Sequence, residues 1–557
     1  MKKLLLLALL INITILSQSQ GVYKFAVEFN DKNSTPFSLD EPSDFLSQRA
    51  IDRRVKYNIG YNETDLPIDP QYIANVLAAT SDAKLIIQVK WMNTILISLS
   101  DSSNIELINE LPSVANIKLV FSHSWKKSKG AKFQSKFTTS EPLANEYFKG
   151  TQEFDSAFYG GAWVQTHQMN VEKMHQQGFK GQGMVIAVLD AGFISADTLR
   201  IFQSLWDNNQ ILGTKNFVVP GMTVFAGHSH GTSVLSTMGG YWEGTLVGTA
   251  PEADYWLIRT EDDTQGTETV TEEYNWVAGA AFADSVGADV LNTSLGYTTF
   301  DDPSQDHTWA DLDGNKTVIT RGANMAYYKG MLPVNSAGNS GNKPWRYIGA
   351  PADGTEVFSI GAVNGDGELA SFSSIGFPWS DDVKPNVVAR GAGTYVASAY
   401  DNVVGQSNGT SFSSPVMAGA IASLWSADPS LSPYWIKRAI EKSSSQYMQP
   451  DTLLGYGIPN FQDALNILGV NQIQFGENFL SVSPNPMETI AYLTLSTIEQ
   501  SSFDMNIYDI QGRLIESEER VYTGSKMPIN ISKLHSGIFI LEVIMDNQTH
   551  RLKINKL

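Results

Sequence analysis

The stretch that decides the fold runs from Met184 to Gly192 and reads MVIAVLDAG. Its uninterrupted aliphatic run predicts a strand buried on both faces, as in a parallel sheet covered by helices. Similar apolar runs follow at 288–292 and 331–335, with helical patterns between them. This alternation predicts an α/β fold with a parallel central sheet and helices on both faces. Because chemistry in such sheets collects at the carboxyl ends of strands, Asp190 is a candidate functional residue.

A second motif, GHSHGTS at 227–233, contains two of the eight histidines of the chain. His230 is followed by Gly-Thr, which is compatible with a helix start that presents the imidazole to a cleft. The His-x-His spacing could instead chelate zinc, although no third ligand stands nearby in the sequence.

A third motif, NGTSFSSP at 408–415, precedes a helical pattern at 416–425. We expect Gly409 to allow close backbone approach and Pro415 to occupy the first helical turn. Ser411 would then lie at a helix N-terminus, where the dipole favours developing negative charge. Taken singly, Asp190 and Ser411 have an ordinary alternative as cap or turn residues.

Together, in the order Asp, His, Ser, these motifs resemble the catalytic domain of the subtilase family. The resemblance spans about residues 159–468 and includes NTSLG at 292–296 and NSAGNSG at 335–341. It implies a serine endopeptidase that works through an acyl-enzyme and an oxyanion site. The implied catalytic residues are Asp190, His230, Ser411 and Asn339 (the oxyanion donor), and the implied substrate-binding residues are Ser294, Leu295 and Gly296.

The sequence departs from the subtilase pattern in three places. Ala191 replaces the usual Thr or Ser after the aspartate, and residues 234–236 lack the common Ala-Gly. Pro333 is expected to interrupt the strand that leads to Asn339, because proline lacks the N–H that a sheet ladder uses. Such an interruption could shift the oxyanion segment.

The resemblance implies no cofactor for the chemistry, but structural calcium is common among subtilases. Residues 311–315, in an Asp-rich stretch, superficially resemble a calcium loop. They lack the later bidentate Glu of that motif, so a solvated surface loop is the alternative.

The flanking regions suggest secretion. Residues 1–19 have the charged start and apolar run of a signal peptide. Residues 20–123 form a predicted α+β unit in the place of a subtilase propeptide, an inhibitor and folding chaperone, although an ordinary accessory domain would show the same pattern. Residues 124–158 form a predicted linker and processing region, and residues 159–470 the predicted peptidase domain.

Residues 472–557 are predicted to form a small β-sandwich. The segments SPNP at 483–486, NIYDIQGR at 506–513 and RLKINKL at 551–557 resemble the type IX secretion sorting domain of Bacteroidetes-type bacteria. That resemblance implies a secretion-machinery partner and an extracellular or cell-surface location after transit through the periplasm. A carbohydrate-binding module is the alternative, but this region has no tryptophan.

Composition narrows the remaining possibilities. The formal net charge of −19 disfavours nucleic acid as a partner, and the absence of cysteine excludes disulfides and thiol catalysis. The resemblances to the subtilase family and to the sorting domain imply a secreted monomeric endopeptidase with protein substrates and its own propeptide as inhibitor. Two alternatives stay open: a catalytically impaired subtilase-like surface protein, and an esterase that uses Ser407 in the elbow-like GQSNG at 405–409.

Overall fold

The computed structural model describes residues 22–125, 154–262, 268–468, 480–495, 501–509, 513–522, 527–545 and 548–557. The predicted signal peptide and most of the predicted processing region lie outside these residues. The chain divides into two compact units, Met1–Ala464 and Leu465–Leu557, which are described separately. Within the described ranges, no helix combines the length and the apolar character needed to cross a membrane.

The first unit begins with a small α+β region, as the sequence predicts. Its antiparallel sheet has the order β2-β3-β1-β4. Apolar side chains of β1 and β3 pack with helices α2 and α3 in one core. The elements are β1 (Tyr23–Phe29), α1 (Gln48–Lys56), α2 (Pro70–Ala79), β2 (Lys84–Val89), β3 (Thr94–Leu99), α3 (Ile105–Asn109) and β4 (Val114–Ser122).

The larger region of this unit is built on a seven-stranded sheet of order β13-β12-β11-β10-β5-β9-β6. Every pairing in it is parallel. All residues of β5, β10, β11 and β12 are buried, so both faces of the central strands are covered. The α/β prediction is thereby confirmed. The strands are β5 (Val185–Asp190), β6 (Ile211–Asn216), β9 (Asp254–Arg259), β10 (Val290–Thr293), β11 (Leu332–Ser336), β12 (Phe358–Val363) and β13 (Val387–Arg390).

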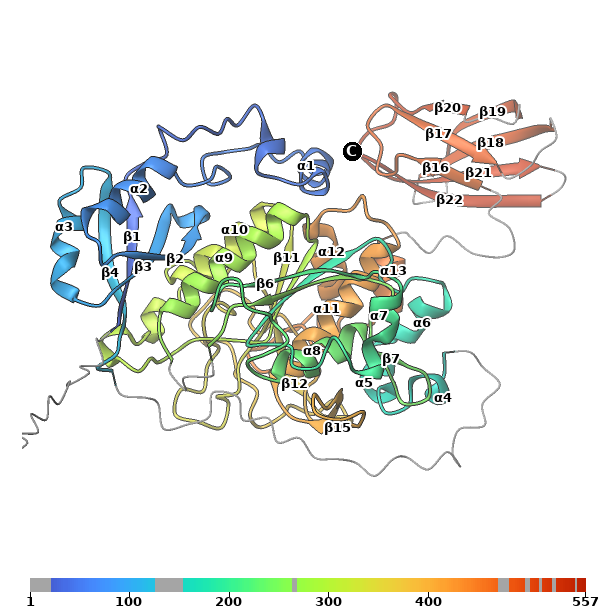
Figure 1. Ribbon diagram of the computed structural model, residues 1–557. Helices are drawn as coiled ribbons and strands as arrows, with labels where there is room; N and C mark the ends of the chain where they lie inside the picture. The colour runs from blue at the N-terminus through green and yellow to red at the C-terminus, as the bar shows by residue number, and fades with distance from the viewer. Residues whose placement is uncertain are drawn as a thin grey trace, which may run out of the picture. The chain divides into compact units, whose positions relative to one another are not determined.

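The long helices pack as two pairs, α9 beside α10 and α8 beside α11 (Figure 1). Two short antiparallel pairs, β7-β8 and β14-β15, complete this region. The helices are α4 (Ser156–Tyr159), α5 (Trp163–His167), α6 (Val171–Gln176), α7 (Gln203–Asp207), α8 (His230–Gly239), α9 (Thr271–Val286), α10 (Val318–Tyr328), α11 (Thr410–Ser426), α12 (Pro433–Lys442) and α13 (Phe461–Ile467). The short strands are β7 (Tyr241–Trp242), β8 (Leu246–Val247), β14 (Thr394–Ala397) and β15 (Val404–Ser407).

Helix α1 is joined to the larger region by a buried charge network, here called the arginine anchor: Arg53, Arg54, Asp65, Asp284 and Lys329. Both guanidinium groups pair with Asp284, Arg54 at 2.9 Å. Arg54 also reaches Asp65 at 3.0 Å, and Lys329 reaches Asp65 at 2.7 Å. All five side chains are at most 4% exposed. The α+β region therefore rests on helix α9 through fully desolvated ion pairs.

The second unit consists of two antiparallel sheets, ordered β16-β17-β20 and β19-β18-β21-β22. Apolar residues from both sheets share one core, including Leu493, Ile529, Ile507 and Leu541. This is the predicted β-sandwich. Its strands are β16 (Leu480–Ser483), β17 (Ile490–Leu495), β18 (Ser501–Asp509), β19 (Leu514–Tyr522), β20 (Met527–Asn530), β21 (Gly537–Met545) and β22 (Gln548–Lys556).

Candidate active site

Asp190 and His230 form a buried hydrogen-bonded pair at the carboxyl edge of the sheet. Asp190 is the last residue of β5 and is fully buried. The Nδ1 of His230 donates to its two carboxylate oxygens at 2.8 and 3.0 Å. The main-chain N–H of Ala191 also donates to Asp190, at 2.8 Å. This arrangement fixes the imidazole with Nδ1 toward the carboxylate, which leaves Nε2 as the nitrogen able to accept a proton.

His230 opens helix α8, as the sequence predicts. A Cβ on the following Gly231 would lie 2.4 Å from the main-chain oxygen of Gly192 and 3.0 Å from the Cβ of Asp190. The glycine therefore permits the close approach of α8 to β5. His228 accepts the main-chain N–H of His230 through its own Nδ1 at 3.0 Å, which removes that nitrogen from the zinc alternative.

Ser411 is the second residue of α11, a buried helix that begins at Thr410. The prediction that Pro415 lies in the first turn is wrong, because the helix starts five residues before it. A residue at 415 would ordinarily donate its N–H to the carbonyl of residue 411. Since proline has no N–H, that carbonyl is released, and it accepts the hydroxyl of Ser294 at 2.8 Å instead.

The contact between Ser294 and Ser411 is reciprocal. The Oγ of Ser411 donates to the main-chain oxygen of Ser294 at 3.2 Å. Ser294 directly follows β10, so this pair links the predicted substrate segment to the predicted nucleophile. The proline four residues after Ser411 is visible in the sequence, but the sequence does not show that Ser294 binds the carbonyl that this proline leaves free.

The side chain of Asn339 is hydrogen-bonded to Thr410, the residue before Ser411. The Oδ1 of Asn339 accepts the N–H of Thr410 at 2.9 Å and its hydroxyl at 3.0 Å. A Cβ placed on Gly409 would lie 3.6 Å from Asn339 Nδ2 and 3.7 Å from Ser411 N. Gly409, with φ of +152°, leaves that space open. The side-chain N–H of Asn339 and the main-chain N–H of Ser411 therefore both lie beside Gly409, and all three residues line the cleft described next.

These groups open into a cleft of about 800 Å³. Its lining includes all three predicted substrate-binding residues and every predicted catalytic residue except the buried Asp190. They are His230, Ser294, Leu295, Gly296, Asn339 and Ser411. The structure therefore brings the sequence-predicted residues together around one cavity.

The expected interruption of the strand at Pro333 does not occur. Strand β11 is continuous, and Pro333 pairs with Leu291 of β10. The N–H of Leu332 points to the β10 side, where it donates to the main-chain oxygen of Asp289, the residue before β10, at 2.8 Å. Because successive N–H groups of a strand point to opposite sides, an N–H at position 333 would point toward β12. The pairing of β11 with β12 begins only at Val334, so no hydrogen bond is lost at Pro333. The proline precedes that ladder.

Ser407, the alternative nucleophile, lies in strand β15 rather than at a sharp turn into a helix. It is 1% exposed, and its hydroxyl has no hydrogen-bond partner among the described residues. It does not line the cleft. The geometry around Ser407 therefore lacks the base and the access that an esterase needs.

The Asp-rich segment at 311–315 is occupied by its own hydrogen bonds. Asp311 pairs with Lys316, and it accepts the N–H and the hydroxyl of Thr308 at 2.8 and 2.6 Å. These contacts hold the pKa of Asp311 well below its usual range. Asp311 is therefore occupied by protein contacts, which favours the surface loop over a calcium loop.

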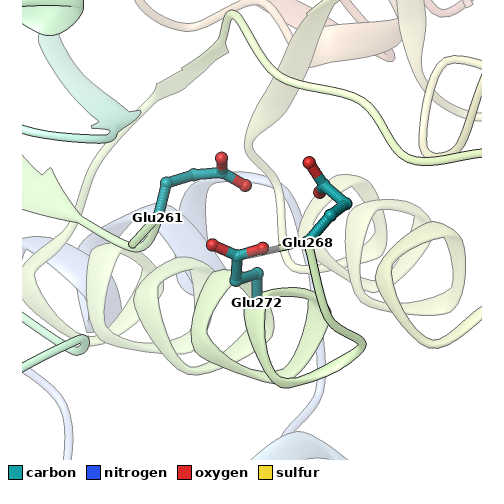
Figure 2. Close-up of side chains that lie close together, drawn as sticks. All are labelled: Glu261, Glu268 and Glu272. Atoms are coloured by element: carbon teal, nitrogen blue, oxygen red, sulfur yellow. The ribbon is translucent and has the colours of Figure 1, made fainter. Parts of the chain in front are cut away.

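A different acidic cluster lies beside the cleft. The carboxylates of Glu261, Glu268 and Glu272 converge, with one oxygen of each within 4.8 Å of the others (Figure 2). Such an oxygen set suits a hard divalent cation such as Ca²⁺. The ammonium group of Lys24, from β1, lies near this cluster. Burial lowers the pKa of Lys24, and the carboxylates of Asp262 and Glu272 act in the opposite direction. Calcium binding stays a prediction.

Comparison with known families agrees with this architecture. Residues 181–457 match the subtilase family, residues 24–136 a Bacteroidota propeptide domain of S8 peptidases, and residues 481–556 a secretion system C-terminal sorting domain. The sorting domain marks a protein that is secreted by the type IX route and ends outside the cell or at its surface. The exact domain boundaries stay predictions.

Relatives support the same assignment. Subtilisin DY of Bacillus licheniformis is 28% identical over 300 residues, which cover 53% of this chain and 96% of that protein. Subtilisin NAT of Bacillus subtilis subsp. natto is 26% identical over 416 residues, or 73% of this chain and 90% of the relative. The chain therefore contains a serine peptidase domain of the subtilase family, with a propeptide domain before it and a secretion sorting domain after it.

Proposed function

We propose that this subtilase is an endopeptidase that hydrolyses proteins through an acyl-enzyme on Ser411. The observation that carries the proposal is the convergence of His230, Ser411 and Asn339 on one cleft. Asp190 is bonded behind the imidazole. Each group needed for acyl transfer to water is present: nucleophile, base, orienting carboxylate and oxyanion donors.

In the proposed mechanism, His230 Nε2 takes the proton of Ser411 Oγ as that oxygen attacks the peptide carbonyl. Asp190 holds the imidazole in the required tautomer and stabilises the imidazolium. The oxyanion is proposed to accept hydrogen bonds from Asn339 Nδ2 and Ser411 N, which both lie beside Gly409. His230 then protonates the departing amine, and water hydrolyses the acyl-enzyme by the same route.

The substrate main chain is proposed to lie along Ser294, Leu295 and Gly296. This segment continues β10 at the cleft edge, where an extended peptide can add as a further strand. The resting hydrogen bond from Ser411 Oγ to Ser294 O would be replaced when the hydroxyl turns toward His230.

The propeptide is proposed to inhibit the peptidase until it is removed. Its strand β4 contacts the start of α9, where Thr271 Oγ1 donates to Val120 O at 3.1 Å. The arginine anchor holds the same region farther along α9. Two separated contacts on one helix support a propeptide that stays bound after cleavage.

The test compares the full chain with Ser411→Ala and Ser407→Ala. We expect Ser411→Ala to lose hydrolysis of casein, conversion of its own precursor and labelling by a fluorophosphonate. Ser407→Ala should retain all three, and mass spectrometry should find internal casein bonds cleaved and the label on Ser411.

The outcomes separate the alternatives. Full proteolysis by Ser411→Ala would refute the proposal. Loss of nitrophenyl ester hydrolysis only in Ser407→Ala would indicate an esterase. An inert wild type that is processed by an added protease and still takes no label would indicate a catalytically impaired surface protein.

A further inference from the structure

A second pocket, of about 220 Å³, lies next to the catalytic cleft. Its walls combine aromatic rings with charged side chains, among them Trp309, Asp313, Phe377, Trp379, Asp382 and Lys384. Trp309 comes from the loop between β10 and α10, and Trp379 from the loop between β12 and β13. Nothing in the proposed hydrolysis uses this pocket.

The aromatic part of the pocket is an ordered cluster that remains open to solvent. The ring centroids of Trp309 and Trp379 are 5.9 Å apart, and that of Tyr347 lies 5.3 and 5.2 Å from them. The two tryptophans nevertheless remain 46% and 59% exposed. Large exposed aromatic side chains that are gathered in this way mark interaction sites.

The loop that carries Trp309 is fixed in place. Trp309 begins a short 3-10 helix, Trp309–Asp311, whose Asp311 bonds back to Thr308 and pairs with Lys316. The carboxylate of Asp311 therefore stabilises the turn that carries Trp309.

The pocket and the cleft lie on either side of one short segment. Tyr347 and Gly349 line the catalytic cleft, whereas Ile348 between them lines the second pocket. Since the ring of Tyr347 also contacts both tryptophans, a polypeptide that leaves the cleft over Tyr347 meets this surface next.

The charges of the pocket favour a cation. Asp313 and Asp382 are exposed at its rim. The buried Asp353 is bonded inward to Thr320 Oγ1 and Gly314 N, and burial raises its pKa to about 6, so it contributes little to the charge at the rim. The single ammonium, Lys384, is turned inward to the main-chain oxygens of Gly354 and Val357 at 2.6 Å each. Burial also lowers the pKa of Lys384 to about 7. The surface that a ligand meets is thus aromatic and negative.

We infer that this pocket is an accessory subsite that binds a lysine or arginine side chain of the substrate polypeptide at a distance from the scissile bond. The cation would stack on Trp309 or Trp379 and pair with Asp313 or Asp382. The inference rests on the proposed endopeptidase function and adds a substrate preference to it.

The experiment uses the matured full-length enzyme and quenched fluorescent peptides derived from a cleaved casein sequence. Arg, Gln, Phe or Glu is placed singly at each position outward from the bond in an alanine host. We expect one outlying position where Arg raises kcat/KM about tenfold over Gln, mainly through KM. Trp309→Ala with Trp379→Ala, and separately Asp313→Asn with Asp382→Asn, should reduce that advantage to twofold or less.

Trp435→Ala is the matched control, because Trp435 is 50% exposed on α12 and does not line the pocket. It should keep the arginine advantage and cleave the alanine host as the wild type does, and for the subsite variants the Arg-to-Gln ratio is compared within each variant. A gain with Phe but not Arg would overturn the inference in favour of an apolar subsite. No positional effect in a host that is cleaved would also overturn it.

A binding measurement keeps the inference testable if no peptide is cleaved. Fluorescence anisotropy of the labelled Arg peptide on Ser411→Ala should show binding at least fivefold weaker after both tryptophans are replaced. Equal binding would refute the subsite, whereas an uncleaved host together with tryptophan-dependent binding would refute only the endopeptidase.

Discussion

The arginine anchor and the catalytic cleft both depend on a buried carboxylate, but the two carboxylates have different partners. Asp284 is surrounded by two guanidinium groups that are permanently charged. Asp190 is paired with an imidazole, whose second ring nitrogen can accept and return a proton during catalysis. A guanidinium partner gives a fixed contact, while an imidazole partner gives a group that can transfer protons.

The comparison teaches that burial alone does not indicate function. Asp284 and Asp190 are both fully buried, yet only the pair of Asp190 and His230 opens on a cavity. Substitutions in the anchor should therefore change the stability of the precursor, and substitutions in the cleft should change turnover.

The largest effect is expected for Asp190→Asn. An amide at this position favours the wrong tautomer of His230, so kcat on a casein-derived peptide should fall about 10⁴-fold. Asp284→Asn is the matched control, because it removes a buried carboxylate without touching the cleft. Active-site-titrated kinetics should find its kcat within about twofold of wild type, and a comparable loss there would erase the distinction between the two regions.

Arg54→Met should follow, measured on the Ser411→Ala precursor so that the chain stays intact. The change leaves Asp284 and Asp65 buried with fewer cations, which costs about 3–5 kcal/mol of unfolding free energy in urea. Arg49→Met serves as the comparison, because Arg49 is 41% exposed where it pairs with Asp289. It should cost about 1 kcal/mol or less. Equal losses would show that burial does not set the strength of this interface.

Asn339→Ala should lower kcat about 10²–10³-fold with little change in KM, because the side-chain donor acts on charge that develops in the transition state. Asn342→Ala, an exposed neighbour in the cleft lining, should leave kcat within about threefold. If both variants behaved alike, Asn339 would be a wall residue rather than an oxyanion donor.

The smallest effect concerns His175, a buried histidine away from the cleft. It contacts Tyr159 Oη at 2.6 Å and Thr249 O at 3.1 Å, and burial lowers its pKa to about 4. Between the ordinary pKa of 6.5 and this value, only the unfolded chain binds the proton, so stability falls as the pH falls. From pH 7 to pH 5 the loss from this group should be about 2 kcal/mol.

Urea unfolding of the Ser411→Ala precursor at both pH values, with and without His175→Gln, isolates that contribution. The substitution should flatten the pH dependence by about the same amount. If the substitution left the pH dependence of the unfolding free energy unchanged, His175 would bind its proton as readily in the folded protein as in the unfolded chain.

Sequence reasoning located the parts of the fold whose signals are local. The apolar run before Asp190 predicted β5, and the order of the three motifs predicted the residues that line one cleft. Local patterns also predicted the α+β unit at 20–123. Each single motif lies within about ten residues of chain, whereas the order of the motifs spans the peptidase domain.

Features that join distant segments were not predicted. Arg54 and Asp284 are 230 positions apart, and neither stands in a recognisable motif. Pro333 leaves the sheet intact because β11 has no partner at that position on the side where the N–H is missing. Which strand lies on that side depends on the order of strands in the sheet. The contacts of Asp311 with Lys316 and Thr308 are local, but the Asp-rich composition of the stretch did not indicate them.

The proline at 415 has a consequence for anyone who would redesign this enzyme. By releasing the carbonyl of Ser411 to the hydroxyl of Ser294, it makes Ser294, a proposed substrate-binding residue, also hold the main chain of the proposed nucleophile. The two properties cannot be altered separately at that position. A library that varies Ser294 to change selectivity will also sample the rate of the chemical step, so its hits should be sorted by kcat and KM individually.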